Sequence, residues 1–180
     1  MTFPTFSAGE VLRAADMNAV GLWLVKTVTI GNGVTSVPVT SCFSADYESY
    51  RIVITGGTVN SPGSIVMQLN NSTGSTYGHF GYYGSYGTAT LVPYGPANGT
   101  SWTDAFIANT AGWSAYMDIS NPFVSGRPTT AKAQSTSTAT AYDFYLRDTN
   151  TNSNTVFTIA PLNAGVTMTG GTIRVYGYKN

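Results

Sequence analysis

Alternation of apolar and polar residues with a period of two runs through almost all of the chain after Leu22, and this constrains the fold more than any other feature. In YRIVIT at 50–55, Tyr50, Ile52 and Ile54 share one face and the residues between them share the other. About ten strand-length segments follow this pattern: 22–30, 34–39, 50–55, 64–69, 104–109, 113–119, 140–147, 155–160, 165–169 and 172–179. Their connections are too short and polar for helical crossovers, so we predict an antiparallel, jelly-roll-like β-sandwich over residues 22–180.

Residues 1–21 carry the only helical pattern in the chain. Ser7 and Glu10 have the spacing of a capping box, and Leu12, Ala15 and Ala19 fall on one helical face. We therefore expect a short N-terminal segment with a small helix, followed by the all-β domain.

The N-terminal segment also holds more large apolar side chains than a soluble monomer leaves in water. With the first residues of the β domain they form a candidate anchor: Phe3, Phe6, Leu12, Met17 and Trp23. We expect this anchor to be buried against other subunits or a larger assembly. Burial against the chain's own sandwich is the alternative.

Composition excludes several classes of function. Only 9% of residues are charged, and eight basic residues balance eight acidic ones, so no electrostatic footprint for nucleic acid or an anionic membrane is visible. No stretch approaches the roughly 20 apolar residues of a membrane span, and the N-terminus lacks the features of a signal peptide. Cys42 is the only cysteine, which excludes an intrachain disulfide and predicts a small buried apolar group.

Catalytic and metal-binding patterns are weak. His79 is the only histidine and lies among glycines, with no nucleophile elbow nearby. The segment at 148–152, DTNTN, starts like an EF-hand loop but has Ser153 and Ile159 where glycine and glutamate are required, so a hairpin loop is favoured. A carboxylate pair for glycoside cleavage stays open, with these candidates: Asp46, Glu48, Asp104, Asp118, Asp143 and Asp148. We expect that the protein is not an enzyme and that it binds neither a metal ion nor a cofactor.

The stretch YGHFGYYGSYG at 77–87 combines a glycine at every third position with six rings. One interpretation is a glycine-punctuated strand and hairpin whose rings pack on the sandwich. The other is a contact surface, because one strand face cannot bury all of these rings and tyrosine gives large contact area at low entropic cost. The contact candidates are Tyr77, His79, Tyr82, Tyr83, Tyr86, Tyr94 and Trp102.

Three segments resemble bacteriophage proteins. The opening FSAGEVLRAADMNAVGLWLV is similar to the N-terminal segment of many minor tail and fibre proteins, in which a pattern close to F-x-A-G-[DE]-V-L-x-A-A-D-[ML]-N is common. CFSADYESYRIVITGG resembles the start of their β-rich distal domain, and the ending GGTIRVYGYKN resembles its final strand. These segments cover roughly a quarter of the chain.

The resemblance implies a virion structural protein, displayed as a fibre or spike on a tail, baseplate or capsid. It also implies a homotrimer, held on the virion by the N-terminal anchor through contacts with other virion proteins. The aromatic stretch would then contact the receptor, a host surface glycan. The alternative is a purely architectural capsid fibre or tail decoration with no specific ligand. A depolymerase is disfavoured because the chain is short for a β-helical tailspike and shows no acidic cluster.

Deletion of residues 1–20 tests the anchor. The expected product is a folded, soluble β domain that no longer joins particles, because the apolar groups that dock on the virion are gone. Circular dichroism and co-purification with particles measure the two effects. If the truncated protein unfolds, the segment belongs to the core and is not an anchor.

Overall fold

The computed structural model describes residues 21–95, 99–137 and 139–179. These residues form an all-β structure without a helix, and every strand pairing among them is antiparallel. The expected N-terminal helix lies outside the described residues, as do the anchor residues Phe3, Phe6, Leu12 and Met17. The described part of the chain contains no helix long and apolar enough to cross a bilayer.

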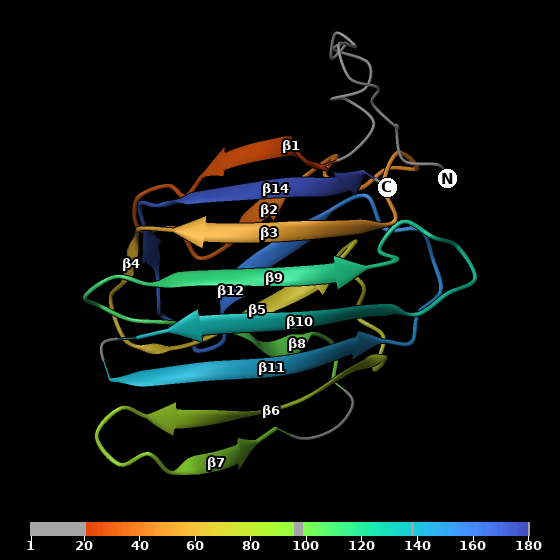
Figure 1. Cartoon of the computed structure of the whole chain (residues 1–180). Coiled ribbons are helices and arrows are strands. Elements are labelled where there is room, and N and C mark those ends of the chain that lie inside the picture. The colour runs from red at the N-terminus through yellow and green to blue at the C-terminus, as the bar shows by residue number, and fades with distance from the viewer. Residues whose placement is uncertain (1–20, 96–98, 138, 180) are drawn as a thin grey trace, which may run out of the picture.

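The described residues form fourteen strands, which make three sheets (Figure 1). The largest has the order β1-β14-β3-β9-β10-β11-β6-β7, the second β2-β12-β5-β8, and the third pairs β13 with β4. The strands are β1 (Gly21–Thr29), β2 (Val37–Val39), β3 (Ser49–Thr55), β4 (Thr58–Val59), β5 (Gly63–Leu69), β6 (Tyr77–Ser85), β7 (Leu91–Tyr94), β8 (Trp102–Ala108), β9 (Ser114–Ser120), β10 (Thr129–Thr136), β11 (Thr140–Asp148), β12 (Phe157–Pro161), β13 (Met168–Thr169) and β14 (Thr172–Lys179).

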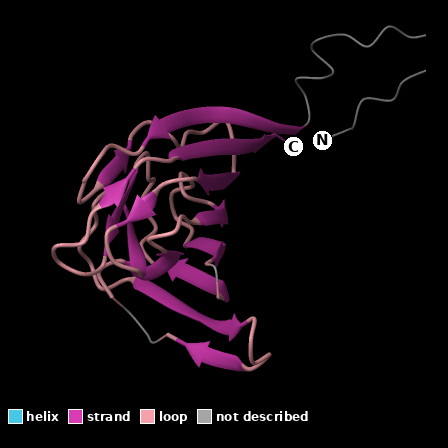
Figure 2. Ribbon diagram, turned by 90° about the vertical axis from the view of Figure 1, so that its left-hand side faces the viewer, coloured by secondary structure: helices cyan, strands magenta, loops and turns pink. Residues whose placement is uncertain are grey.

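The two larger sheets lie face to face around one apolar core (Figure 2). The alternation predicted for β3 is confirmed, because Tyr50, Ile52 and Ile54 are fully buried. The hydroxyl of Tyr50 donates to the carbonyl of Ser44 and accepts from its backbone N–H, so this buried polar group is satisfied. Cys42 is buried in the same core, as expected.

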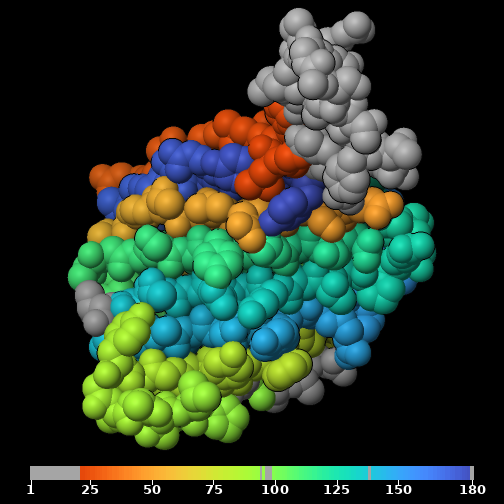
Figure 3. Space-filling view, in the orientation of Figure 1, coloured from red at the N-terminus to blue at the C-terminus, as the bar shows by residue number. Residues whose placement is uncertain are grey.

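Only one face of the eight-stranded sheet is covered by the second layer. Figure 3 shows the opposite face, on which β3, β9, β10, β11 and β6 lie side by side, and the described residues place no further sheet over them. The two edge strands of this sheet are β1 and β7. Trp23 lies in β1, half-buried and paired with Gly177, so this anchor candidate is part of the large sheet.

The glycine-rich stretch forms β6 and the turn that leads to β7. A glycine period of three against a strand period of two sends successive glycines to opposite faces of the sheet. Gly81 faces the core, where an added Cβ would lie 2.2 Å from the carbonyl oxygen of Asp143 and 2.5 Å from Cδ1 of Phe144. Gly84 faces outward, where an added Cβ would lie 3.5 Å from Cδ2 of Leu91, an ordinary van der Waals distance. The strand-and-hairpin interpretation therefore describes the backbone correctly.

Gly81→Ala and Gly84→Ala form a matched test of this register. Gly81→Ala should lower the free energy of unfolding by about 1–3 kcal/mol, because its methyl group meets a backbone carbonyl that cannot move away without disturbing β11. Gly84→Ala has only ordinary contacts and should change stability much less. Urea denaturation of both variants measures the difference. Equal effects would contradict the assignment of Gly81 to the inner face.

Candidate functional site

Two of the expected contact residues are in the core, which corrects the sequence-based prediction. Tyr77 and Trp102 are fully buried and pack edge to face, with ring centroids 5.6 Å apart. The Tyr77 hydroxyl donates to the carbonyl of Leu69 and accepts from its N–H, and the Trp102 indole donates to the carbonyl of Arg147. Both polar groups are satisfied internally, so neither ring is available to a partner in this fold.

His79 and Tyr83 also point between the sheets. The His79 side chain is 5% exposed, and its Nε2 lies 3.1 Å from Oδ2 of Asp104 without the alignment of a hydrogen bond. Asp104 accepts hydrogen bonds from the hydroxyls of Ser64 and Thr103. Burial raises the pKa of Asp104, but these contacts outweigh it and leave the pKa below its usual value. Tyr83 is half-buried and packs against the ring of Tyr142 at 5.7 Å.

The remaining candidates divide by location. Tyr82 points outward from β6 and is 38% exposed, while Tyr86 lies in the turn after β6 and is 66% exposed. Tyr94 belongs to β7 and pairs with Gly81, but its side chain lies outside the described residues. Of the expected set, only Tyr82 belongs to the site described next.

Antiparallel register aligns outward-facing residues in rows across the large sheet. One row, which we call the floor row, has small side chains except at its β7 end: Thr55, Ser114, Thr136, Ala141, Gly84 and Leu91. The adjacent row, the wall row, is larger and more polar: Val53, Tyr116, Gln134, Asp143 and Tyr82. The difference in side-chain size along the same strands leaves a depression beside the wall row.

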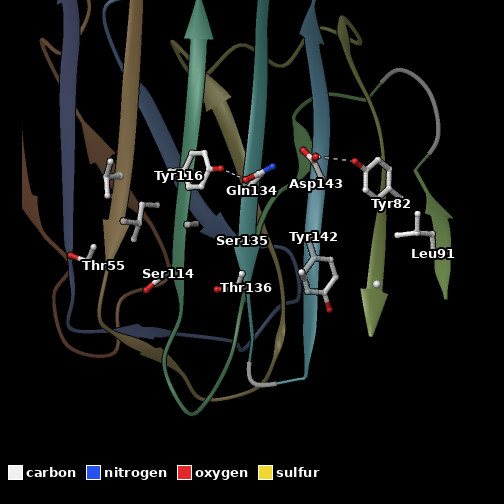
Figure 4. A pocket seen from close by; sticks show the side chains of 15 residues that line it. Thr55, Tyr82, Leu91, Ser114, Tyr116, Gln134, Ser135, Thr136, Tyr142 and Asp143 are labelled. Carbon is white, nitrogen blue, oxygen red and sulfur yellow. Dashed lines mark hydrogen bonds between the residues drawn. The ribbon is translucent and has the colours of Figure 1, made fainter. Parts of the chain in front are cut away.

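This depression is a groove of about 400 Å³ across β3, β9, β10, β11, β6 and β7. Figure 4 shows Tyr116, Gln134, Asp143 and Tyr82 along one side, with Thr55, Ser114 and Thr136 nearer the strand ends. The hydroxyl of Tyr82 donates to Oδ2 of Asp143 at 3.1 Å, and the hydroxyl of Tyr116 donates to Oε1 of Gln134. Both exposed rings are thus held in place by their neighbours.

A cluster of two rings and one ion pair borders the groove on the β3 side. Arg51 binds Asp118 through two hydrogen bonds of 2.7 and 2.6 Å, and its guanidinium lies 5.6 Å from the ring centroid of Tyr116 and 5.9 Å from that of Tyr178. The Tyr178 hydroxyl donates to Asp118 at 2.7 Å. Burial and this carboxylate raise the pKa of Tyr178 to about 12.

A second cluster of the same composition borders the groove on the β6 side. Lys132 Nζ lies 3.2 Å from Oδ2 of Asp143 and 5.3 Å from the ring centroid of Tyr145. Tyr145 stacks on Phe80 at 5.1 Å, and Phe80 is 64% exposed. The uncovered face therefore presents an array of aromatic rings fixed by paired charges.

Sequence reasoning missed Tyr116, Gln134 and Lys132, and it weighed Asp143 only as a possible acid or base. The outward positions of strands 114–120 and 140–147 contained the signal, but the strand at 129–136 was not recognised. Without that strand, the neighbours of Asp143 in the sheet are unknown.

Cys42 is buried in the core and does not line this groove. Burial raises the pKa of the Cys42 thiol to about 12, which opposes formation of a nucleophilic thiolate. Among the described residues, no three His, Cys, Asp or Glu side chains are grouped to hold a metal ion. In the loop after β11, Asp148 Oδ1 accepts from the N–H of Asn150, and Asn150 Oδ1 accepts from that of Asn152, as in a turn.

Comparisons with known proteins do not identify a family. No protein-family model matches the chain. No curated protein matches it either. Among solved structures, a mutant of the alginate lyase Aly36B in complex with alginate trisaccharide aligns over 94% of both chains with 11% identity and a TM-score of 0.21. A likeness this weak carries no argument about fold or function.

Asp118→Asn tests the ion pair that fixes the β3-side rings. Arg51 lowers the pKa of Asp118, so the stabilisation is present above the ordinary carboxyl pKa of about 4 and is lost as pH falls through the folded-state value. The variant should lose about 0.5–1 kcal/mol at pH 7, a small value because the pair is partly exposed. The difference between the two proteins should shrink progressively as pH is lowered below about 4. A difference that stays constant over the whole acid range in which both proteins remain folded would contradict an ionic contribution.

Proposed function

We propose that the uncovered face of the large sheet binds a glycan on a bacterial surface, and that the chain is the displayed part of a bacteriophage tail, baseplate or capsid fibre. The observation that carries the binding proposal is the groove beside Tyr116 and Tyr82. Soluble proteins seldom leave a groove lined by aromatic rings exposed to solvent. Such a groove on a face that no second sheet covers therefore indicates a binding surface.

The chemistry of the groove suits a sugar. A pyranose has an apolar face of C–H groups that packs on a flat ring, and hydroxyls at its edge that need hydrogen-bond partners. The groove offers rings from Tyr116 and Tyr82, and polar partners from Gln134, Ser114 and Thr136. A few polar groups set among apolar contacts are typical of sites that select a small ligand.

Rigidity supports the same conclusion. The hydroxyls of Tyr82 and Tyr116 each donate a hydrogen bond to a neighbouring side chain, and Tyr116 also packs against the Arg51 guanidinium. Because these two rings are already held in place, little side-chain entropy is lost on binding. The rings project from paired strands, which hold a site more firmly than loops do.

Virion attachment rests on the sequence resemblance of residues 6–25, 42–57 and 170–180. We infer a jelly-roll-like sandwich that assembles as a homotrimer, because several weak glycan contacts on one particle gain strongly in avidity. We infer binding without turnover. The architectural alternative is that the same aromatic face is covered by another virion subunit.

A double variant, Tyr82→Ala with Tyr116→Ala, tests the glycan proposal in intact particles. Adsorption to host cells should fall by about tenfold or more, because two central aromatic contacts are lost. Tyr86→Ala is the matched control, since this tyrosine is more exposed but lies in the turn outside the groove. It should leave adsorption unchanged.

Assembly and adsorption of particles that carry the double variant distinguish glycan binding from the architectural role. Normal assembly with reduced adsorption supports glycan binding. Failed assembly of the double variant, with the isolated protein still folded by circular dichroism, supports the architectural role. Normal assembly with normal adsorption contradicts both uses of the face.

A further inference from the structure

The two ion pairs beside the groove each cancel locally. Arg51 is engaged by both oxygens of Asp118, and Lys132 by Asp143, so neither cation is left to attract an anionic ligand. Each carboxylate would also repel a negatively charged sugar. Arg174 has no ion-pair partner among the residues that the structure describes, but it is bound to Thr55 at the β14 end of the face. Four strand spacings, about 19 Å, separate it from Asp143.

Asp143 has hydrogen-bonding capacity to spare. Its Oδ2 accepts from Tyr82 and contacts Lys132, while Oδ1 is buried and meets no donor. A buried acceptor without a donor is costly, so a donor that reaches it gains free energy. Asp143 lines the groove, and the terminal torsion of aspartate is broad, so its carboxylate can adjust to a ligand that brings a donor. A sugar hydroxyl can supply that donor, whereas an ionised carboxylate cannot.

The shape of the groove sets the size of the ligand. The floor row crosses six strands at right angles to their direction, which corresponds to five spacings or about 24 Å. It runs along the ends of the strands, beside the wall row. A single sugar fills only part of such a path, while an extended chain follows its whole length.

We propose, building on the glycan-binding function above, that the groove holds an internal segment of a linear polysaccharide laid across the strands, uncharged where it passes Tyr116, Gln134 and Asp143. Asp143 is the specificity-determining residue: it accepts a hydroxyl and, by pairing with Lys132, hides the cation that would otherwise attract acidic polymers. The ligand class is neutral polysaccharide.

An array of purified bacterial polysaccharides, neutral and acidic, tests the ligand class with the full-length protein. Binding should concentrate on neutral polymers. Calorimetry with fragments of the best polymer should show affinity rising at least tenfold from a disaccharide to a segment that spans the groove. Preference for uronate- or phosphate-containing polymers, or affinity independent of length, overturns the inference but leaves glycan binding standing. No binding to any glycan removes the proposed function and the inference together.

Asp143→Asn gives a reciprocal test, because it removes the carboxylate that Lys132 contacts, while Asp118, opposite Lys132 in the sheet, stays engaged by Arg51. This variant should bind the neutral polymer at least tenfold more weakly and should gain binding to carboxymethyl-dextran, measured by affinity electrophoresis with neutral dextran as the reference. The control, Lys132→Gln with Asp143→Asn, removes both charges and should lose the gained binding. Circular dichroism checks that both variants fold. Unchanged affinity for the neutral polymer, or no gain on carboxymethyl-dextran, overturns the role of Asp143.

Discussion

The structure depends on the antiparallel register of the eight-stranded sheet. Backbone pairing fixes which residues stand opposite one another, and the alternation of side chains sends Ile52, Met117 and Ala133 into the core while their neighbours face outward. The second sheet covers only the inner face. The backbone hydrogen bonds that fix this register therefore determine which side chains enter the core. On the other face of the sheet, they align the floor row and the wall row of the groove.

The aromatic stretch at 77–87 shows how this register divides a conspicuous sequence feature. Alternation along β6 sends Tyr77, His79 and Tyr83 inward and Phe80 and Tyr82 outward. Position 81 also faces inward, and a glycine fits there because Phe144 occupies the space that a side chain would need. The density of rings thus reflects two separate tasks, core packing and surface display, that share one strand.

Much of the fold could be predicted from the sequence, because period-two alternation is a local property. The segment at 50–55 is an example. The burial of Cys42 was predicted from its residue type instead, because free cysteines are usually buried. The strand at 129–136, TTAKAQST, was missed because Ala and Lys have low strand propensity, and its place between β9 and β11 decides its conformation. The groove could not be predicted from the sequence for a related reason. Tyr82, Tyr116 and Asp143 come from distant segments, and no local pattern states which strands become neighbours.

The central claim is that the ligand lies on the uncovered face of the large sheet, across its strands. Amide chemical-shift mapping during titration with fragments of host surface polysaccharide tests it most directly. The account predicts that shifts concentrate at the outward positions of β9, β10, β11 and β6, around Tyr116, Gln134, Asp143 and Tyr82. Shifts confined to the β6–β7 turn around Tyr86, or to the space between the sheets near Tyr83, would contradict it.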